Sequence, residues 1–317
     1  MTTALAPAAD ADRILPGIVL MLGFCVFGPM LDVAAKLAAD TLPVGQIATA
    51  RFLVQVVLML PLCLVMGLGL RLRRELWGIV TARALLLIVA TYLFIGAIAI
   101  MPLADALAIV FVEPFIILIF AKIFFDDEVG ARRIGASAVG FAGVLLVIQP
   151  SFVEFGAVAL LPLGTAFSFA AYMLVTRGLS RRMHPVAMQY HTAVIASLIC
   201  VSVLMMANGR DWPTLDPVMP QGIVWLWLFG VGFFAALSHL MITYALKFAP
   251  SATLAPLHYL EIVMAALLGY LVFNDFPDRL TLTGITIIVG SGLYVIHRER
   301  VNAHKPLVTQ SPPAAAI

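Results

Sequence analysis

Apolar residues in this chain come in blocks of about 20, and that block length limits its possible folds more than any other feature. An α-helix rises 1.5 Å per residue, so one block crosses the roughly 30 Å hydrocarbon core of a bilayer. Only 11% of the 317 residues are charged, whereas a soluble domain usually has about 25%. The blocks lack the apolar–polar alternation of a β-barrel. The sequence therefore predicts an all-α integral membrane protein.

Ten blocks can be placed as transmembrane spans joined by short loops. They cover residues 14–38, 44–66, 78–100, 102–123, 133–149, 154–176, 186–207, 222–247, 251–273 and 280–297. The first block is too long for the apolar core of a signal peptide and is expected to be a retained helix. The longest loop, 208–221, is rich in proline and is predicted to be an extended surface loop. The polar tail 298–317 is predicted to be disordered and cytoplasmic.

The lysine and arginine residues predict how these spans are oriented, because cytoplasmic loops carry an excess of both. With a cytoplasmic N-terminus, fifteen of the nineteen basic residues, Arg83 among them, fall on the cytoplasmic side. Only Arg210 and Arg279 fall in outer loops, and Lys36 and Arg51 lie within spans. The sequence thus predicts a multi-pass protein of the cell inner (plasma) membrane with both termini in the cytoplasm.

The two halves of the chain, 14–149 and 154–297, repeat each other. Matched positions 148 residues apart include Pro102 with Pro250, Glu113 with Glu261 and Phe125 with Phe273. Each half holds five predicted spans, and because five is odd, the halves are expected to be inserted in opposite orientations. Inverted repeats of this kind are typical of secondary transporters, which bind their solute near the membrane midplane.

Several short motifs carry a resemblance to a known family. They are Ala50-Arg51-Phe52, Glu113-Pro114, Phe125-Asp126-Asp127-Glu128 and the glycines of 135–143 and 284–292. With these motifs, residues 14–297 resemble the ten-helix branch of the drug/metabolite transporter superfamily, which has two EamA repeats. The resemblance implies alternating access and a central cavity lined by spans 1, 3, 4, 6, 8 and 9. It implies solutes such as amino acids or their derivatives, S-adenosylmethionine or riboflavin. The second half departs from the pattern, because Ile262 follows Glu261 where the first half has proline.

Ionisable residues within spans are the main candidates for substrate or proton binding, because a charge at mid-bilayer costs at least about 2.5 kcal/mol on insertion scales. Glu113 and Glu261 lie near the middle of spans 4 and 9, as functional carboxylates or as hydrogen-bonded structural ones. Asp32 and Lys36 are four residues apart and are predicted to pair on one face of span 1, at the cavity or at the outer helix end. Asp105 is a candidate for the vestibule.

Histidines and tyrosines complete the candidate set. His258 in span 9 and His239 in span 8 either titrate near neutrality or are neutral and hydrogen-bonded. Tyr172 in span 6 and Tyr244 in span 8 either contact a planar solute or pack between helices. Arg51 is interpreted as structural, because the resemblance puts span 2 outside the cavity.

The remaining features favour transport over other functions. Cys25, Cys63 and Cys200 lie in apolar blocks and are predicted to be free and buried. The sequence indicates no cofactor, no metal site and no nucleic-acid partner, and it lacks the common motifs of hydrolases and phosphate loops, so no enzyme is expected. The expected function is secondary active transport of a small organic metabolite. Proton coupling and a homodimer through the glycine-rich spans 5 and 10 are further expectations. The alternatives are an intramembrane enzyme, a channel, and a sensor or scaffold.

Overall fold

The structure is a computed structural model that describes residues 14–113, 115–116, 120, 131–180, 182–248, 257 and 260–303. Within these ranges the regular secondary structure is entirely helical, which confirms the predicted all-α class. The helices are α1 (Ile14–Ala39), α2 (Val44–Val65), α3 (Trp77–Ile98), α4 (Leu103–Val110), α6 (Ala131–Phe155), α7 (Leu161–Ser180), α8 (Pro185–Ala207), α9 (Val224–Phe248), α11 (Leu260–Phe273) and α12 (Arg279–Ala303), with 3-10 turns η2 (Arg74–Leu76) and η3 (Gly156–Leu160).

Six helical segments are long and apolar enough to cross a membrane. They are Leu15–Ala39, Val44–Val65, Arg74–Ile98, Ser151–Ser180, Pro185–Ala207 and Val224–Ala245. Shorter apolar helical segments cover Ala138–Val147, Leu260–Phe273 and Arg279–Ser291. The protein is therefore a multi-pass membrane protein, while the count of ten spans remains a prediction.

The polarity of the bundle is the reverse of that of a soluble protein. Apolar side chains such as Val65, Val153 and Met205 have 86%, 85% and 75% of their surface exposed. Charged side chains such as Arg83 and Glu113 are instead buried at 0% and 3% exposure. Such an outer surface suits lipid, because apolar side chains meet no penalty there and ionisable ones do.

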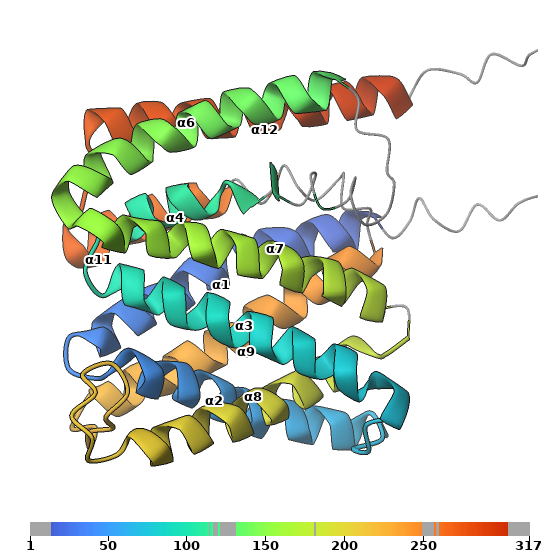
Figure 1. Cartoon of the computed structure of the whole chain (residues 1–317). Coiled ribbons are helices and arrows are strands. Elements are labelled where there is room, and N and C mark those ends of the chain that lie inside the picture. The colour runs from blue at the N-terminus through green and yellow to red at the C-terminus, as the bar shows by residue number, and fades with distance from the viewer. Residues whose placement is uncertain are drawn as a thin grey trace, which may run out of the picture.

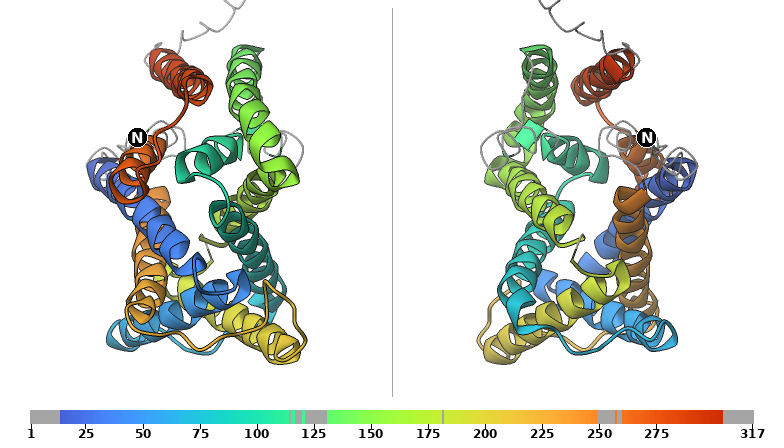
Figure 2. Two further views of the ribbon diagram at one scale, coloured as in Figure 1. Left: turned by 90° about the vertical axis from the view of Figure 1, so that its left-hand side faces the viewer. Right: turned by 90° about the vertical axis from the view of Figure 1, so that its right-hand side faces the viewer.

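The helices form two arms that meet at both edges (Figures 1 and 2). One arm contains α1, α9 and α11, and the other contains α3, α4 and α7. Helices α2 and α8 pack against each other at one edge of the bundle, and α4 meets α11 near the other, beyond which α6 packs along α12. The space between the arms is the place where a solute site is expected.

Helix contacts in one arm have counterparts in the other. The pair α1–α9 corresponds to α3–α7, α2–α9 to α3–α8, and α1–α11 to α4–α7. The corresponding helices α1 and α7 run in opposite directions along the bundle, and so do α6 and α12 (Figure 1). The packing therefore keeps its pattern when the first half of the chain is exchanged with the second.

Glycines bring α6 and α12 into close contact, as expected for close helix packing in membranes. A Cβ atom added at Gly284 would lie 2.6 Å from the carbonyl oxygen of Gly143, and one added at Gly143 would lie 3.0 Å from the carbonyl oxygen of Gly284. These two glycines are thus used for packing within one chain. The homodimer through spans 5 and 10 remains a prediction.

The loop before α9 has no helix or strand and is exposed along most of its length, as expected for a surface loop. It folds back onto the start of α2, where the Gly45 amide donates to the Thr214 carbonyl at 2.9 Å. Gln46 donates to the Val218 carbonyl at 2.7 Å and accepts from its amide at 2.9 Å. The Tyr92 hydroxyl of α3 donates to the Thr214 hydroxyl at 2.7 Å. Polar partners on α2 and α3 therefore order a segment that its proline content alone predicts to be extended.

Candidate functional site

A cavity lies between the two arms, with walls from α1, α3, α4, α7, α9 and α11 and one residue of α2. The empty space within it, including its open mouth, is about 800 Å³. Its polar lining consists of Asp32, Arg51, Thr91, Glu113, Thr165, Ser238, His239 and Glu261. Its aromatic lining consists of Phe24, Phe94, Phe111 and Phe169. The cavity thus combines apolar walls with a small set of charged groups.

Four of the predicted site residues come together in this cavity: Asp32, Glu113, His239 and Glu261. All four side chains are at most 8% exposed. Four others, Lys36, Asp105, Tyr172 and Tyr244, do not line it. The ninth, His258, lies outside the residues that the structure describes.

Glu261 packs against α1 at a glycine. A Cβ atom added at Gly28 would lie only 2.6 Å from Glu261 Oε1, so the missing side chain makes room for this carboxyl group. Asp32 follows Gly28 by one helical turn and lines the same cavity. Residues four apart share a helix face, so the carboxyl groups of α1 and α11 lie on neighbouring parts of one wall.

Glu113 follows a break in its helix. Helix α4 ends at Val110, and Phe111 and Val112 form a turn before Glu113. The sequence gives the reason, because proline at position 114 has no amide hydrogen for the Val110 carbonyl four residues earlier. Irregular backbone at membrane depth is tolerated where it lines a cavity, and this break does so.

Arg51 is a charged residue of the cavity wall that the sequence does not predict there. It extends from α2 into the cavity wall, is 5% exposed, and donates to the Thr91 hydroxyl. Its Nη2 lies 2.7 Å from His239 Nε2. A guanidinium only donates, so Nε2 must accept, and the ring proton is carried by Nδ1. The interpretation of Arg51 as a residue away from the cavity is wrong.

A second arginine continues this network away from the cavity. His239 Nδ1 lies 3.3 Å from the Tyr172 hydroxyl, which accepts a hydrogen bond from Arg83 Nη2 at 2.5 Å. Arg83 also donates from Nε to Thr176 at 2.9 Å and from Nη1 to Thr192 at 2.5 Å. Arg83, which the sequence analysis counts on the cytoplasmic side, is fully buried, and three hydroxyls on neighbouring helices satisfy its guanidinium. Tyr172 belongs to this network and does not line the cavity.

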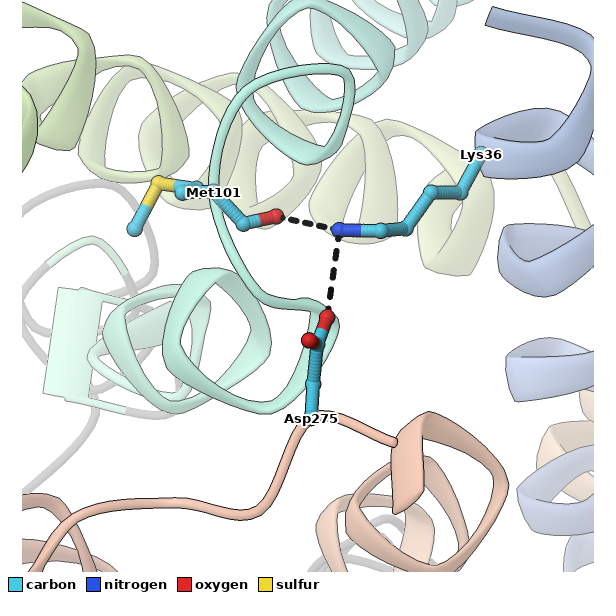
Figure 3. Close-up of polar contacts among 3 residues, drawn as sticks. All are labelled: Lys36, Met101 and Asp275. Carbon is cyan, nitrogen blue, oxygen red and sulfur yellow. Dashed lines mark hydrogen bonds and ion pairs between the residues drawn. The ribbon is translucent and has the colours of Figure 1, made fainter. Parts of the chain in front are cut away.

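Lys36 joins α1 to the other half of the chain (Figure 3). Its Nζ donates to the Met101 carbonyl at 2.8 Å and lies 3.6 Å from Asp275 Oδ2. The same ammonium lies 5.2 Å from the centre of the Phe273 ring. The predicted Asp32–Lys36 pair is thus not the ion pair that forms. Asp32 faces the cavity, whereas the longer lysine side chain reaches the end of the bundle, where Asp275 is available.

The two remaining candidates lie near the ends of helices. Asp105 is in the first turn of α4, half-buried, and its Oδ1 has no hydrogen-bond partner among the described residues. Tyr244 packs edge-on against His184 and is stacked on Phe248, with ring centres 6.1 and 5.9 Å apart. Tyr244 thus packs against two neighbouring rings and does not line the cavity.

The cysteines and the possible metal ligands of the described residues were the remaining candidates for chemistry. Cys25, Cys63 and Cys200 are free and buried, as predicted. Among the described residues, no group of three or more His, Cys, Asp or Glu side chains is arranged to hold a metal ion.

Comparison with known proteins decides the family. The model of the EamA-like transporter family matches residues 15–149 and 156–297. The chain belongs to the EamA-like transporter family. This confirms the resemblance to the drug/metabolite transporter superfamily that the sequence motifs carry.

Relatives in this family are named as transporters. The chain is 28% identical to a riboflavin transporter of Vibrio cholerae over 81% of this chain and 84% of the relative. It is 27% identical to an S-adenosylmethionine uptake transporter of Rickettsia bellii over 85% of this chain and 89% of the relative. A pseudopaline exporter of Pseudomonas aeruginosa is 24% identical over 88% and 95%. These names point to transport and not to catalysis.

A solved crystal structure shares the fold. It superposes with a TM-score of 0.62 and covers 94% of this chain and 100% of the other, at 16% sequence identity. At this identity the likeness concerns the fold alone.

Proposed function

We propose that this protein is a secondary active transporter that moves a small organic metabolite across the inner membrane by alternating access. We further propose that ten spans form two inverted five-helix repeats with both termini in the cytoplasm. The exchange symmetry of the helix contacts and the opposite directions of α1 and α7 support the inverted arrangement. The family match supports transport.

One observation carries the proposal: Glu113 and Glu261, equivalent positions of the two halves, both line the cavity between the arms. Carboxyl groups of a pair of repeats at one cavity are the arrangement expected of a solute or proton site at a repeat interface. Asp32 adds a third carboxyl group, and His239 with Arg51 forms the polar wall on the α2 side. The phenylalanine rings supply surfaces on which a planar solute can stack.

In the proposed cycle the carboxyl groups bind the solute or a proton while one side of the bundle is closed. The contact of Lys36 with Met101 and Asp275 closes the end at which α1 finishes and α12 begins. The break after α4 beside Glu113 allows this segment to bend when the arms rock. From the sequence, we propose that Asp105 lies in the vestibule and that His258 belongs to the solute site.

The substrates named for the relatives suggest which solutes to test. Relatives named as transporters of riboflavin and of S-adenosylmethionine match this chain over most of its length. Both compounds contain a planar ring system. We propose a transporter of one of these two solutes, and the flux assay below determines the direction of transport.

Solute flux in proteoliposomes tests the function against a sensor or scaffold, which would move no solute. We expect labelled S-adenosylmethionine or riboflavin to accumulate with wild-type protein. Glu113→Gln should abolish flux or reduce it severely, with protein level and monodispersity near normal, because it removes the charge and keeps the shape. Glu261→Gln should be milder, because Ile262 follows it where the first half has proline. Wild-type flux in Glu113→Gln would return this residue to a structural role.

A further inference from the structure

Two buried arginines of one network differ in how well they are satisfied. Arg83 donates from Nε, Nη1 and Nη2 to three hydroxyls and does not line the cavity. Arg51 lines the cavity, and its only hydrogen-bond partners among the described residues are Thr91 and His239, both neutral. Its buried Nε has no partner in that part of the chain. The pattern of a structural arginine is thus complete in Arg83 and incomplete in Arg51.

The charge of Arg51 is also unbalanced at close range. No carboxylate of the described residues lies within the 4.0 Å of an ion pair with it, although Arg51 is 5% exposed. Buried charges in proteins are normally paired, and a guanidinium matches a carboxylate with two parallel hydrogen bonds. An entering carboxylate would supply what Arg51 lacks.

The two glutamates of the cavity have the opposite sign and come from segments toward the opposite edge of the bundle. Arg51 belongs to α2, which packs against α8 at one edge. Glu113 follows α4 and Glu261 lies in α11, and these two helices meet near the other edge (Figure 2). A solute that carried only negative charge would be repelled by these carboxyl groups, and one that carried only positive charge would leave Arg51 unpaired.

We propose that Arg51 is the subsite for the carboxylate of a zwitterionic solute, whose cationic group lies toward Asp32, Glu113 and Glu261. This assignment rests on the proposed transport function and names its substrate class. His239 acts as a positioning residue, since its Nε2 fixes one edge of the guanidinium while Tyr172 and Arg83 hold the ring from behind.

Binding to purified full-length protein tests the subsite separately from transport. The probes are S-adenosylmethionine and standard amino acids, each compared with its decarboxylated amine, which keeps the cation and loses the carboxylate. Riboflavin is the probe without a carboxylate. We expect at least one zwitterion to raise the melting temperature of the wild type, and its amine to bind about 10- to 100-fold more weakly, as for the loss of a charged hydrogen bond.

Variants of the two arginines make the comparison specific. Arg51→Gln should bind the zwitterion about 10- to 100-fold more weakly and bind the amine as the wild type does. Arg83→Lys, the matched control in the same network, should lower thermal stability yet keep the preference for the zwitterion over its amine. If Arg51→Gln does not fold, Arg51→Lys serves instead, because it keeps the charge but loses Nε, and should weaken the preference at least severalfold.

Each result is informative. Loss of the zwitterion preference in Arg51→Gln and its retention in Arg83→Lys would support the subsite. The inference is overturned if no zwitterion binds, if riboflavin or the amines bind as tightly as the zwitterions, or if Arg51→Gln keeps the wild-type preference. A zwitterion that binds through Arg51 but is not carried in proteoliposomes would support the subsite and contradict the transport function. Flux of riboflavin in the absence of binding by any zwitterion would support the transport function and contradict the subsite.

Discussion

Lys36 Nζ of α1 lies 3.6 Å from Asp275 Oδ2, in the segment between α11 and α12. The two residues belong to different halves of the family match, so this ion pair crosses from one repeat to the other. Asp32, one helical turn before Lys36, lines the cavity. The contact therefore lies beyond the candidate solute site, at the end of the bundle that we propose it closes.

Removing this contact should favour the state in which that end is open. Lys36→Met keeps the length and apolar packing of the side chain but loses the ion pair and the bond to Met101. A partly exposed ion pair is worth about 0.2–1 kcal/mol and a hydrogen bond about 0.5–1.5 kcal/mol, so we expect the open population to rise roughly 3- to 70-fold while it remains the minor state. The measurement is the rate at which a membrane-impermeant maleimide labels Ala90→Cys on the cavity wall.

The controls for this prediction use the same chain. The labelling background lacks the native thiols of Cys25, Cys63 and Cys200. Lys247→Met removes an exposed lysine in the last turn of α9 and should leave the labelling rate unchanged. The charge swap Lys36→Asp with Asp275→Lys should restore slow labelling. Equal rates in Lys36→Met and the parent would show that this contact does not hold the end closed.

Gly28→Ala should impair the site without disrupting the fold. The new methyl group would lie 2.6 Å from Glu261 Oε1, and the tip of a flexible side chain is the part that gives way. The carboxyl group would then leave its place beside α1. We expect an initial rate of solute flux roughly tenfold lower, or ~1.4 kcal/mol, within the about 1–3 kcal/mol of a single overpacking change.

A matched glycine provides the comparison for Gly28. A Cβ atom at Gly178 in α7 would meet nothing within 4 Å, so Gly178→Ala should transport as the wild type does. Both variants should be monodisperse and have melting temperatures close to the parent. Normal flux in Gly28→Ala would mean that the position of Glu261 does not matter for transport.

The topology prediction concerns the C-terminal end of the last helix and the loop before α9. A reporter fused after Arg300 should read as cytoplasmic, and one fused after Arg210 should read as periplasmic, because basic residues collect on the cytoplasmic side. Alkaline phosphatase and green fluorescent protein fusions, which are active on opposite sides of the membrane, make the measurement. A periplasmic signal after Arg300 would contradict the ten-span arrangement.

The fold and the acidic part of the site could be predicted because their signals are local or repeated. Block length and charge content are properties of short windows, and the 148-residue offset pairs Glu113 with Glu261 by sequence position alone. The cost of burying a carboxyl group then makes both residues candidates, and both line the cavity. The break after Val110 follows from one proline, whose effect on a helix is fixed by its own geometry.

The errors concern side chains whose partners are distant in sequence. Arg83 bonds Thr176 and Thr192, which lie 93 and 109 residues away, so counting basic residues near a span end could not show that it is buried. Lys36 pairs with Asp275 and not with Asp32, which lies four residues earlier in the same helix. The long lysine side chain reaches a carboxylate at the end of the bundle, and this reach matters more than the local spacing. The expected place of its helix puts Arg51 outside the cavity, although its long side chain lines the cavity wall.

Gly284→Ala should destabilise the contact between α6 and α12. The added methyl group would lie 2.5 Å from the Val147 side chain and 2.6 Å from the Gly143 carbonyl oxygen. Because one of these neighbours is backbone, the helices must move apart, and we expect a loss of about 1–3 kcal/mol of stability. Thermal unfolding of purified protein in detergent measures it. Gly290→Ala, in the same helix with nothing within 4 Å of the new Cβ, should unfold at or slightly above the wild-type temperature, since alanine is the better helix former. Equal melting temperatures for the two variants would mean that the α6–α12 contact adds little to the stability of the bundle.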